Sequence, residues 1–453
     1  MKVALVVDNP KRDLSGLTLL AYELSKYDIE VYLVPMYEQV LHIMAINPDF
    51  ILLNYCRPIN AKKIKQYKSL GFKVGVLDTE GGILRDIYKE LLISVEKSNV
   101  ESLLDVYFLW GNKQLEVFSE YFSSKNFNTK LFCCGSPRYD FLDSDFKEFL
   151  SFDKNLKGYI LLIASFPICN PKFVSLEEEA KNMTEALGYS LEHVQKIQSN
   201  YLKRLSEYIK LIKKLLNLYP NEQFVLRAHP FENHDLYQNE FKDYSNIILN
   251  SEGEIFSVLH NAKLMVQINS STGVEAAMIN IPVVQPEYMN AKEDNVEQIT
   301  NSSYLAYSEK EFINLFNSLI NNKSNYYIDN RKKEIEKYIK QLINDYFYNI
   351  DGKSSQRVAK CIASFLDENI SNKKETVPLF FMEYVISLLK LSIKSILNKN
   401  YIKHRQQKNL HGDVVKSIIH FKQNDENNIQ VIEESYYFNK IKSNRFKIFL
   451  KKK

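Results

Sequence analysis

The sequence predicts an α/β fold with two consecutive domains, each built on a largely parallel sheet. Over the first 140 of the 453 residues, short apolar runs alternate with amphipathic stretches of helix length. A polar segment, 143–157, then interrupts the pattern, and the same alternation restarts behind it. Strands separated by helix-length segments are typical of βαβ units, whose strands run parallel.

The first domain is predicted to hold six strands with helices between them. Its first apolar run stops after five residues at Asp8, which predicts a buried strand rather than the apolar segment of a signal peptide. No apolar stretch approaches the length of about 18 residues that a membrane span needs. The predicted strands are Val3–Val7, Val31–Val34, Phe50–Leu53, Lys73–Leu77, Val106–Leu109 and Lys130–Cys133, and the helical patterns are Leu17–Lys26, Gln39–Ile46, Ala61–Leu70 and Leu84–Lys97.

The second domain repeats the pattern, with a long helical stretch over Glu177–Leu218. We therefore predict a first domain over 1–145, a second over 155–370 and a tail over 371–453. Because ligands of such sheets bind beyond the carboxyl ends of the strands, candidate site residues should directly follow strands. The predicted strands of the second domain are Tyr159–Ile163, Gln223–Leu226, Ile247–Leu249, Lys263–Ile268 and Ile281–Val284.

The tail carries an excess of positive charge, whereas the rest of the chain carries an excess of negative charge. Residues 371–453 hold 17 Lys and Arg against 7 Asp and Glu, whereas the first 370 residues hold 42 against 48. The segment 378–397 has apolar residues broken by charges, which predicts a helix lying in a membrane interface, and 441–453 interleaves cations with large apolar residues. We expect a helical, basic extension on an anionic membrane surface; a solvated or partner-binding extension is the alternative.

The composition also excludes several kinds of site. The five cysteines form no CxxC pair and have no metal-ligand spacing, which predicts reduced thiols and no metal centre. A GxGxxG fingerprint is absent, so no dinucleotide cofactor is expected, nor any other cofactor. The acidic body lacks a nucleic-acid reader motif, and nucleic acid is not expected as a partner.

A carboxylate-rich loop follows the predicted strand Lys73–Leu77. Asp78 and Glu80 stand at the carboxyl end of this strand, and Gly81 and Gly82 behind them let a ligand approach the backbone. A carboxylate in this place can act as a general base on an acceptor hydroxyl. The same residues can instead cap a helix, which needs no ligand.

A second candidate loop, Arg227-Ala228-His229-Pro230, follows the strand that ends at Leu226. The planar guanidinium of Arg227 suits phosphate oxygens, and His229 can add a donor or a proton to a leaving phosphate. Pro230 ends the strand and fixes the turn. A histidine at a strand end can also be purely structural.

A third loop, Asn269-Ser270-Ser271-Thr272, lies between a predicted strand and the start of a helix. Free backbone amides at a helix start, with hydroxyls beside them, form a phosphate site. The alternative is a helix cap completed by Glu275, which needs no ligand. Glu275 also lies near enough to reach a ribose diol.

Other residues at strand ends are assigned to the acceptor side of the site. The segment after the first strand offers polar side chains for acceptor contacts or for helix capping. Trp110, the only tryptophan, offers a sugar platform or core packing. The acceptor or cleft candidates are Asp8, Asn9, Arg12, Asp13, Gly81, Gly82, Trp110 and Arg138.

Four motifs occur in order at predicted strand ends: Asp-x-Glu-Gly at 78–81, Gly-Ser-Pro-Arg-Tyr-Asp at 135–140, Arg-x-His-Pro at 227–230 and Asn-Ser-Ser-Thr-Gly-x-Glu-Ala at 269–276. Together they resemble the surface carbohydrate biosynthesis protein group of GT-B glycosyltransferases. That group is similar to the capsule Kdo transferases, the bacterial sialyltransferases and the CDP-glycerol glycerophosphotransferases. The resemblance covers about residues 1–350.

The resemblance implies two Rossmann-like domains that face a cleft and an inverting, metal-independent transfer. The donor it implies is a CMP-activated acidic sugar of the Kdo or nonulosonic acid type, and the acceptor a surface glycan or glycolipid such as capsule or lipopolysaccharide. Bacterial sialyltransferases take their base from an acidic pair before a glycine. Here Thr79 stands at the first acidic position, which leaves Glu80 as the base and Asp78 as the alternative.

The resemblance also assigns the phosphate contacts. The family's His-Pro pair and its Ser-Ser or Ser-Thr motif contact the nucleotide phosphate, and they correspond to His229-Pro230 and to 270–272. Three alternatives stay open: a CDP-glycerol or other NDP-donor transferase, a non-catalytic scaffold, and a nucleic-acid-binding protein. We expect a cytoplasmic protein, peripheral on the inner face of the cytoplasmic membrane.

Overall fold

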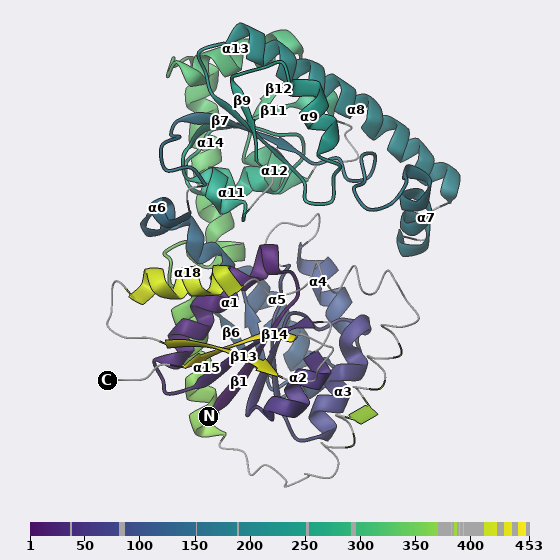
Figure 1. The fold of residues 1–453 in the computed structure, drawn as a ribbon, viewed down its shortest axis with the longest axis vertical. Helices are drawn as coiled ribbons and strands as arrows, with labels where there is room; N and C mark the ends of the chain where they lie inside the picture. The colour runs from purple at the N-terminus through teal and green to yellow at the C-terminus, as the bar shows by residue number, and fades with distance from the viewer. Residues whose placement is uncertain are drawn as a thin grey trace. The chain divides into compact units, whose positions relative to one another are not determined.

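The computed structural model describes residues 1–36, 39–80, 87–150, 152–187, 190–250, 253–290, 296–369, 412–423, 430–436 and 443–449, with single positions between 382 and 393. The chain divides into two compact units (Figure 1). The first combines residues 1–143 with residues from 342 onward, and the second comprises 144–341.

The first unit is built on a mixed sheet in the order β13-β14-β2-β1-β3-β4-β5-β6. The six neighbouring strands from β2 to β6 in this order run parallel, and they confirm the six predicted ones. Because β2 and β3 lie on opposite sides of β1, the strand order reverses at β1 and β3. The strands are β1 (Lys2–Val7), β2 (Glu30–Pro35), β3 (Phe50–Leu53), β4 (Lys73–Leu77), β5 (Val106–Leu109), β6 (Lys130–Cys133), β13 (Gln430–Tyr436) and β14 (Ser443–Phe449).

Helices cover both faces of this sheet. Buried apolar side chains from α2, α3, α4 and α5 form one core against the strands, and α1 and α15 pack together on the other face. The short helices between these elements complete the connections. The helical segments are α1 (Pro10–Ser25), α2 (Gln39–Ile46), η2 (Pro58–Asn60), α3 (Ala61–Ser69), α4 (Ile87–Glu96), η3 (Glu101–Leu103), α5 (Asn112–Ser124), η4 (Pro137–Leu142), η8 (Ile343–Phe347), α15 (Ser354–Glu368) and α18 (Gly412–Gln423).

A glycine sets the close approach of α1 to the loop that follows β6. A Cβ atom at Gly16 would lie 2.6 Å from the backbone nitrogen of Arg138, a distance that no side chain tolerates. Glycine at this position therefore brings α1 and η4 together, and with them two walls of the pocket described below.

The chain returns from the second unit to the first, and the predicted boundary at 370 has to be corrected. Helix α15 buries Val358, Ile362 and Phe365 in the first unit, where Phe365 lies edge-on to Phe50. The carboxylate of Asp140 accepts hydrogen bonds from the first backbone amides of α15, at 2.7 and 2.8 Å. Helix α15 continues the helical pattern of the second domain in sequence but completes the core of the first.

The described part of the tail also belongs to the first unit. Helix α18 packs on α1 (Figure 1), with Val415, Ile418 and Ile419 buried. Strand β14 pairs antiparallel with the edge strand β2, and β13 pairs with β14. Besides a helix, the extension therefore contains a β-hairpin that covers a sheet edge. The interfacial helix predicted over 378–397 lies largely outside the described residues.

The second unit is built on a parallel sheet in the order β12-β11-β10-β7-β8-β9. The strand order reverses at β7 and β10, since β8 lies on one side of β7 and β10 on the other. The strands are β7 (Tyr159–Ala164), β8 (Phe224–Ala228), β9 (Ile247–Leu249), β10 (Ala262–Val266), β11 (Val283–Pro286) and β12 (Tyr304–Ala306).

The long helical stretch predicted over 177–218 consists of two helices, α7 (Leu176–Leu187) and α8 (Leu191–Leu218). Ser190 caps α8, because its hydroxyl accepts a hydrogen bond from the backbone amide of His193 at 3.2 Å. The other helical segments are η5 (Ser144–Phe146), α6 (Lys147–Leu150), α9 (Asp235–Phe241), α10 (Phe256–Leu259), α11 (Thr272–Met278), η6 (Glu287–Met289), α12 (Glu297–Asn301), α13 (Glu309–Ile320) and α14 (Tyr326–Leu342).

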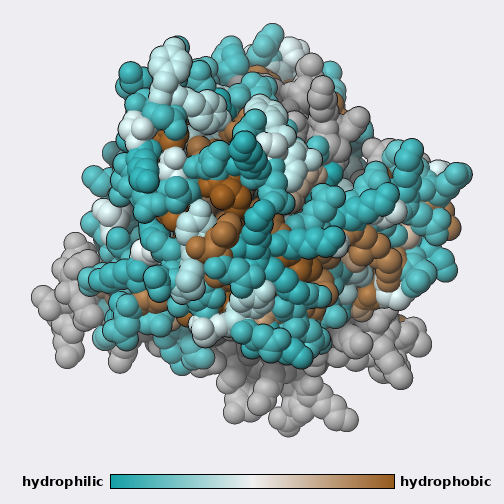
Figure 2. Space-filling model, turned by 90° about the horizontal axis from the view of Figure 1, so that it is seen from above, coloured by the Kyte–Doolittle hydropathy of each residue, from teal (hydrophilic) through white to brown (hydrophobic). Residues whose placement is uncertain are grey.

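Both units are thus doubly wound α/β sheets, and the fold class is the predicted two-domain, GT-B-like one. That the domains face a cleft stays a prediction. Among the described residues, no helix is long and apolar enough to cross a membrane. On the face shown in Figure 2, hydrophilic residues cover most of the surface and hydrophobic ones show between them in separate patches.

Candidate functional site

The candidate loops follow the carboxyl ends of strands in both sheets, and two of them lie where the strand order reverses. In the first unit this point is the carboxyl end of β1 and β3, and in the second unit it is the carboxyl end of β7 and β10. Loops that leave neighbouring parallel strands in opposite directions open a crevice at such a point. The predicted segment at Asp8 directly follows β1, and Gln267 and Ile268 separate the segment at Asn269 from the end of β10.

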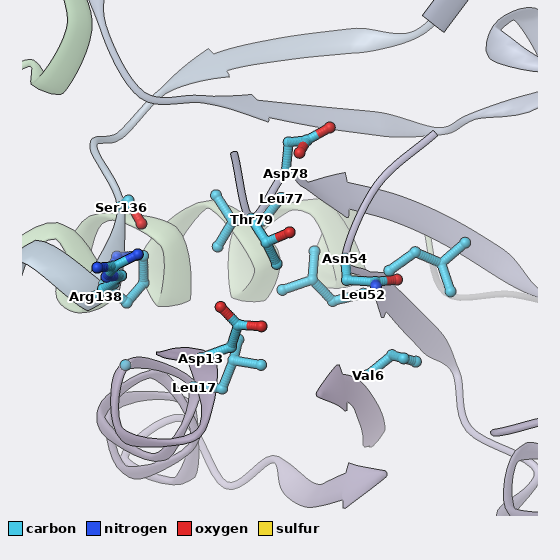
Figure 3. A pocket seen from close by; sticks show the side chains of 13 residues that line it. Val6, Asp13, Leu17, Leu52, Asn54, Leu77, Asp78, Thr79, Ser136 and Arg138 are labelled. Atoms are coloured by element: carbon cyan, nitrogen blue, oxygen red, sulfur yellow. The ribbon is translucent and has the colours of Figure 1, made fainter. Parts of the chain in front are cut away.

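A pocket opens at this point in the first unit, with an empty volume of about 420 Å³, part of it open to solvent. Figure 3 shows the carboxylate of Asp13 and the side chain of Thr79 directed toward one another, and Arg138 on another wall. Aliphatic side chains with a few polar groups around them are the usual lining of a small-molecule pocket. The lining residues are Val6, Asp13, Gly16, Leu17, Leu52, Leu53, Asn54, Leu77, Asp78, Thr79, Ser136, Pro137 and Arg138.

Arg12 joins the carboxylates beside this pocket. Its guanidinium lies 2.8 Å from Asp13, 3.0 Å from Asp8 and 3.5 Å from Glu80. Asp13 also accepts a hydrogen bond from the backbone amide of Asn9 at 2.9 Å. Burial raises the pKa of Asp13, and the neighbouring Arg12 opposes this shift. The predicted acceptor residues at the start of α1 therefore form one connected group.

Asp78 is a buried member of the same group. Its side chain is only 2% exposed, lies 2.9 Å from Arg57 and accepts a hydrogen bond from the Tyr107 hydroxyl at 3.4 Å. Burial raises the pKa of Asp78 to about 6, although Arg57 acts in the opposite direction. In Figure 3 its carboxylate points away from Asp13. Asp78 is thus held in place by protein groups.

Glu80 differs from Asp78 in its exposure. Its side chain is 48% exposed and lies 3.1 Å from Arg57. Its backbone amide donates to Asp78 at 3.0 Å, so the buried carboxylate fixes the loop that carries the exposed one. Of the two candidate bases, Glu80 is the one that a large acceptor can reach. Gly81 and Gly82 lie outside the described residues.

Trp110 does not form a sugar platform, and this candidate is corrected. Its side chain is buried against Tyr139 and Phe347, with ring centroids 5.4 and 6.1 Å away. Its indole nitrogen donates to the backbone carbonyl of Asp78 at 2.9 Å. Trp110 therefore packs in the core, and its hydrogen bond to Asp78 holds the residue that follows β4. Arg138 lines the pocket, with its guanidinium over the ring of Tyr139.

In the second unit, the guanidinium of Arg227 is hydrogen-bonded to other groups of the protein. Its guanidinium donates hydrogen bonds to the Asn250 side chain and to the backbone carbonyl of Gly253. The residue is buried. These contacts hold the loop after β9 against the end of β8. A phosphate contact by Arg227 stays a prediction.

His229 is placed to act as a neutral donor. Its backbone amide donates to the carbonyl of Ala164 at 3.0 Å, which ties it to the end of β7. Its Nδ1 accepts a hydrogen bond from the backbone amide of Phe231 at 3.2 Å, so in the neutral ring the proton is on Nε2. Burial lowers the pKa of His229, which favours this neutral form. Pro230 follows it and is exposed.

The turn before α11 is held by two buried glutamines. Gln267 accepts a hydrogen bond from the amide of Ser270 at 2.6 Å, and Gln285 accepts one from the amide of Asn269 at 3.3 Å. The Gln267 amide group also donates to Gln285 at 2.6 Å. Asn269 has the positive φ of 50° that asparagine tolerates.

These contacts narrow the groups that can receive a phosphate. The amides of Asn269 and Ser270 are used by the glutamines, and the amide of Thr272 lies 3.4 Å from the Ser270 hydroxyl. The hydroxyls of the exposed Ser271 and the half-buried Thr272 remain at the surface of the turn. Glu275 is buried within α11.

The two loops that carry the phosphate candidates, 227–230 and 269–272, follow strands that are not adjacent in the sheet. Strand β7 lies between β8 and β10, so the His229 loop and the turn at 269–272 are one strand apart. The loop after β7, which begins at Ser165, runs between them. This loop is a part of the site that sequence reasoning missed.

Sequence reasoning missed further residues of both sites. Arg57 and Tyr107 were detectable in principle, because Arg57 follows the predicted strand β3 closely and Tyr107 lies within β5. Gln267 directly follows β10, but nothing in the sequence links it to Gln285, 18 residues away. Among the described residues no group of three or more His, Cys, Asp or Glu side chains could hold a metal ion.

No family model and no curated protein matches the chain. Among solved structures, the UDP-GlcNAc 2-epimerase from Methanocaldococcus jannaschii covers 80% of this chain and 100% of its own, at 13% identity and a TM-score of 0.49. The UDP-GlcNAc 2-epimerase from Neisseria meningitidis, bound to UDP-GlcNAc, covers 82% and 100% at 15% identity and a TM-score of 0.48. The wall teichoic acid polymerase TagF covers 82% and 90% at 11% identity and a TM-score of 0.45. The fold class given above rests on the strand order of the two sheets themselves.

Proposed function

We propose that the protein is an inverting glycosyltransferase that moves an acidic sugar of the Kdo or nonulosonic acid type from a CMP-activated donor onto a surface glycan. The observation that carries this proposal is the position of Glu80. It is an exposed carboxylate at the carboxyl end of β4, oriented by two arginines and a buried aspartate, beside the pocket that Asp78 and Thr79 help to line.

The reaction needs one displacement. Glu80 takes the proton of an acceptor hydroxyl, whose oxygen attacks the anomeric carbon of the donor sugar as the bond to the CMP phosphate breaks. Attack from the side opposite the leaving group inverts the anomeric centre. The acceptor sugar occupies the pocket at Asp13, Thr79 and Arg138.

The leaving group is received in the second unit. The Nε2–H of His229 and the hydroxyls of Ser271 and Thr272 donate to the phosphate of CMP as its charge develops. A single phosphate needs few donors, so these groups serve without a divalent ion. Arg227 supports the site by holding the loop after β9.

The attachment to a membrane is a separate part of the proposal. An acceptor that grows on a lipid carrier would require the enzyme at the inner face of the cytoplasmic membrane. The basic tail supports this placement by its charge, while α18 and the β-hairpin hold the described part of the tail on the first unit.

The test is a panel of CMP-, CDP- and UDP-activated donors incubated with the protein and a mixture of surface glycan acceptors. Release of CMP from an acidic sugar donor, with an inverted product, is the expected result. Release of nucleotide from a CDP or UDP donor alone would replace the proposal with the alternative of an NDP-donor transferase. No release from any donor, with acceptor present, would contradict a transferase function.

A further inference from the structure

Two large aromatic side chains are exposed together at the carboxyl end of the second sheet. Phe173 is 53% exposed and Phe231 is 52% exposed. Their ring centroids lie 6.1 Å apart, with 71° between the ring planes. Single exposed apolar side chains are ordinary, but two rings in edge-to-face contact form a corner with two apolar walls.

The backbone holds this corner rigidly. The amide of Lys172 donates to the carbonyl of Phe231 at 2.9 Å, and Pro171 forms a β-bridge with Glu232. The buried carboxylate of Glu232 accepts hydrogen bonds from the amides of Phe166 and His229, at 2.8 and 3.1 Å. The loops after β7 and β8 are therefore joined before any ligand arrives, which lowers the entropic cost of binding.

The corner adjoins the proposed phosphate donor. The Phe231 ring lies 5.4 Å from the imidazole of His229, and the amide of Phe231 is the group that fixes Nδ1 of His229. Lys172 places its ammonium 5.7 Å from the centre of the Phe173 ring. A ligand whose anionic group contacts Nε2 of His229 would thus have an aromatic surface and a further cation beside it.

We propose that this corner is the nucleobase site of the donor nucleotide, where the base stacks on Phe231 and contacts the edge of Phe173. This inference rests on the proposed function and adds the part of the donor that the phosphate contacts leave unplaced. A nucleotide joins a planar ring to a phosphate through a ribose, and the corner offers an aromatic face next to a phosphate donor. An aliphatic chain would gain nothing from His229 and Lys172.

The test uses the full-length protein and three probes: CMP, cytidine and ribose 5-phosphate, with binding measured by calorimetry. The variant Phe231→Leu keeps an apolar side chain but removes the aromatic face. It should bind CMP and cytidine about tenfold more weakly and ribose 5-phosphate as tightly as the wild type, because stacking on an aromatic ring stabilises a base. His229→Ala should show the reverse, with weaker CMP and ribose 5-phosphate binding and unchanged cytidine binding. Tyr326→Leu, at an exposed tyrosine of the same unit, serves as the control.

Each outcome decides a different claim. Unchanged CMP binding by Phe231→Leu overturns the nucleobase site and leaves the proposed function intact. Equal weakening of all three probes also overturns it, because the substitution would then act through the loop rather than through stacking. Wild-type protein that does not bind CMP contradicts the proposed function together with this inference.

Discussion

The two units place their candidate residues at equivalent points of similar sheets, yet the chemistry of the two points differs. The end of the first sheet carries four carboxylates and two arginines in one network: Asp8, Arg12, Asp13, Arg57, Asp78 and Glu80. The end of the second sheet presents a neutral histidine and hydroxyls on a turn that buried glutamines hold.

The difference suits two halves of one reaction. A carboxylate that takes a proton needs neighbouring groups that set its orientation. A site for a leaving phosphate needs donors that are fixed in advance, and hydrogen bonds to the His229 ring and to the turn at 269–272 fix the groups proposed here. In the proposed reaction, the first unit carries out the proton transfer and the second binds the leaving phosphate.

The largest expected effect comes from removing the exposed carboxylate. Glu80→Gln keeps the size of the side chain but cannot take a proton, so the turnover number should fall by about 10³-fold while CMP binding stays unchanged. Initial rates and calorimetry on the same preparation check this. Glu120→Gln, on the exposed face of α5, is the control. An active Glu80→Gln enzyme would mean that the base lies elsewhere.

Removing Arg57 should lower the stability of the folded protein as well as its activity. Arg57→Met leaves Asp78 buried without its cation, which should lower the free energy of unfolding by about 3 kcal/mol near neutral pH. Urea unfolding followed by circular dichroism measures the loss. The double variant Arg57→Met, Asp78→Asn should recover part of it; a double variant less stable than Arg57→Met would show that Arg57 does not serve Asp78.

The raised pKa of Asp78 predicts how stability depends on pH. The folded-state pKa of about 6 exceeds the ordinary value of 3.8, so the folded protein binds the proton more tightly than the unfolded chain. The stabilisation of the folded state by this bound proton is fully present below about pH 4 and is lost as the pH rises through 6. The total change is on the order of 3 kcal/mol.

The measurement compares wild type with Asp78→Asn, which cannot titrate. Free energies of unfolding at pH 4 and pH 7 should show wild type losing stability relative to the variant on going to the higher pH. A constant difference between the two proteins across this range would contradict the raised pKa.

The smallest expected effect concerns the second unit. Gln285→Leu removes the acceptor of the Asn269 amide and the partner of Gln267, which should destabilise the protein by about 1–3 kcal/mol and weaken CMP binding. Unfolding and calorimetry test both effects. Gln238→Leu, at an exposed site on α9, is the control. If Gln238→Leu weakened CMP binding as much as Gln285→Leu does, the buried glutamines would have no specific role in binding.

The sequence was sufficient for the elements that carry strong periodicity. All six parallel strands of the first sheet were predicted, because apolar runs with polar ends are local signals. The turn 269–272 and the loop 78–80 were found by the rule that ligands bind at the carboxyl ends of strands. That rule needs no tertiary information.

Contacts between distant segments could not be predicted in this way. The return of α15 to the first unit and the pairing of β14 with β2 join residues hundreds of positions apart. The burial of Trp110 and the Gln267–Gln285 pair likewise depend on packing across the sheet. Charge composition could not reveal that residues 443–449 pair with β2, because it counts the cations of a stretch and not its strand partners.

The place of the donor nucleotide is the central claim, and a crystal structure of the protein with bound CMP tests it most directly. We predict that the phosphate lies within hydrogen-bond distance of Nε2 of His229 and of the hydroxyls of Ser271 and Thr272, at the carboxyl end of the second sheet. CMP seated in the pocket at Asp13 and Arg138, with His229 uninvolved, would contradict the account.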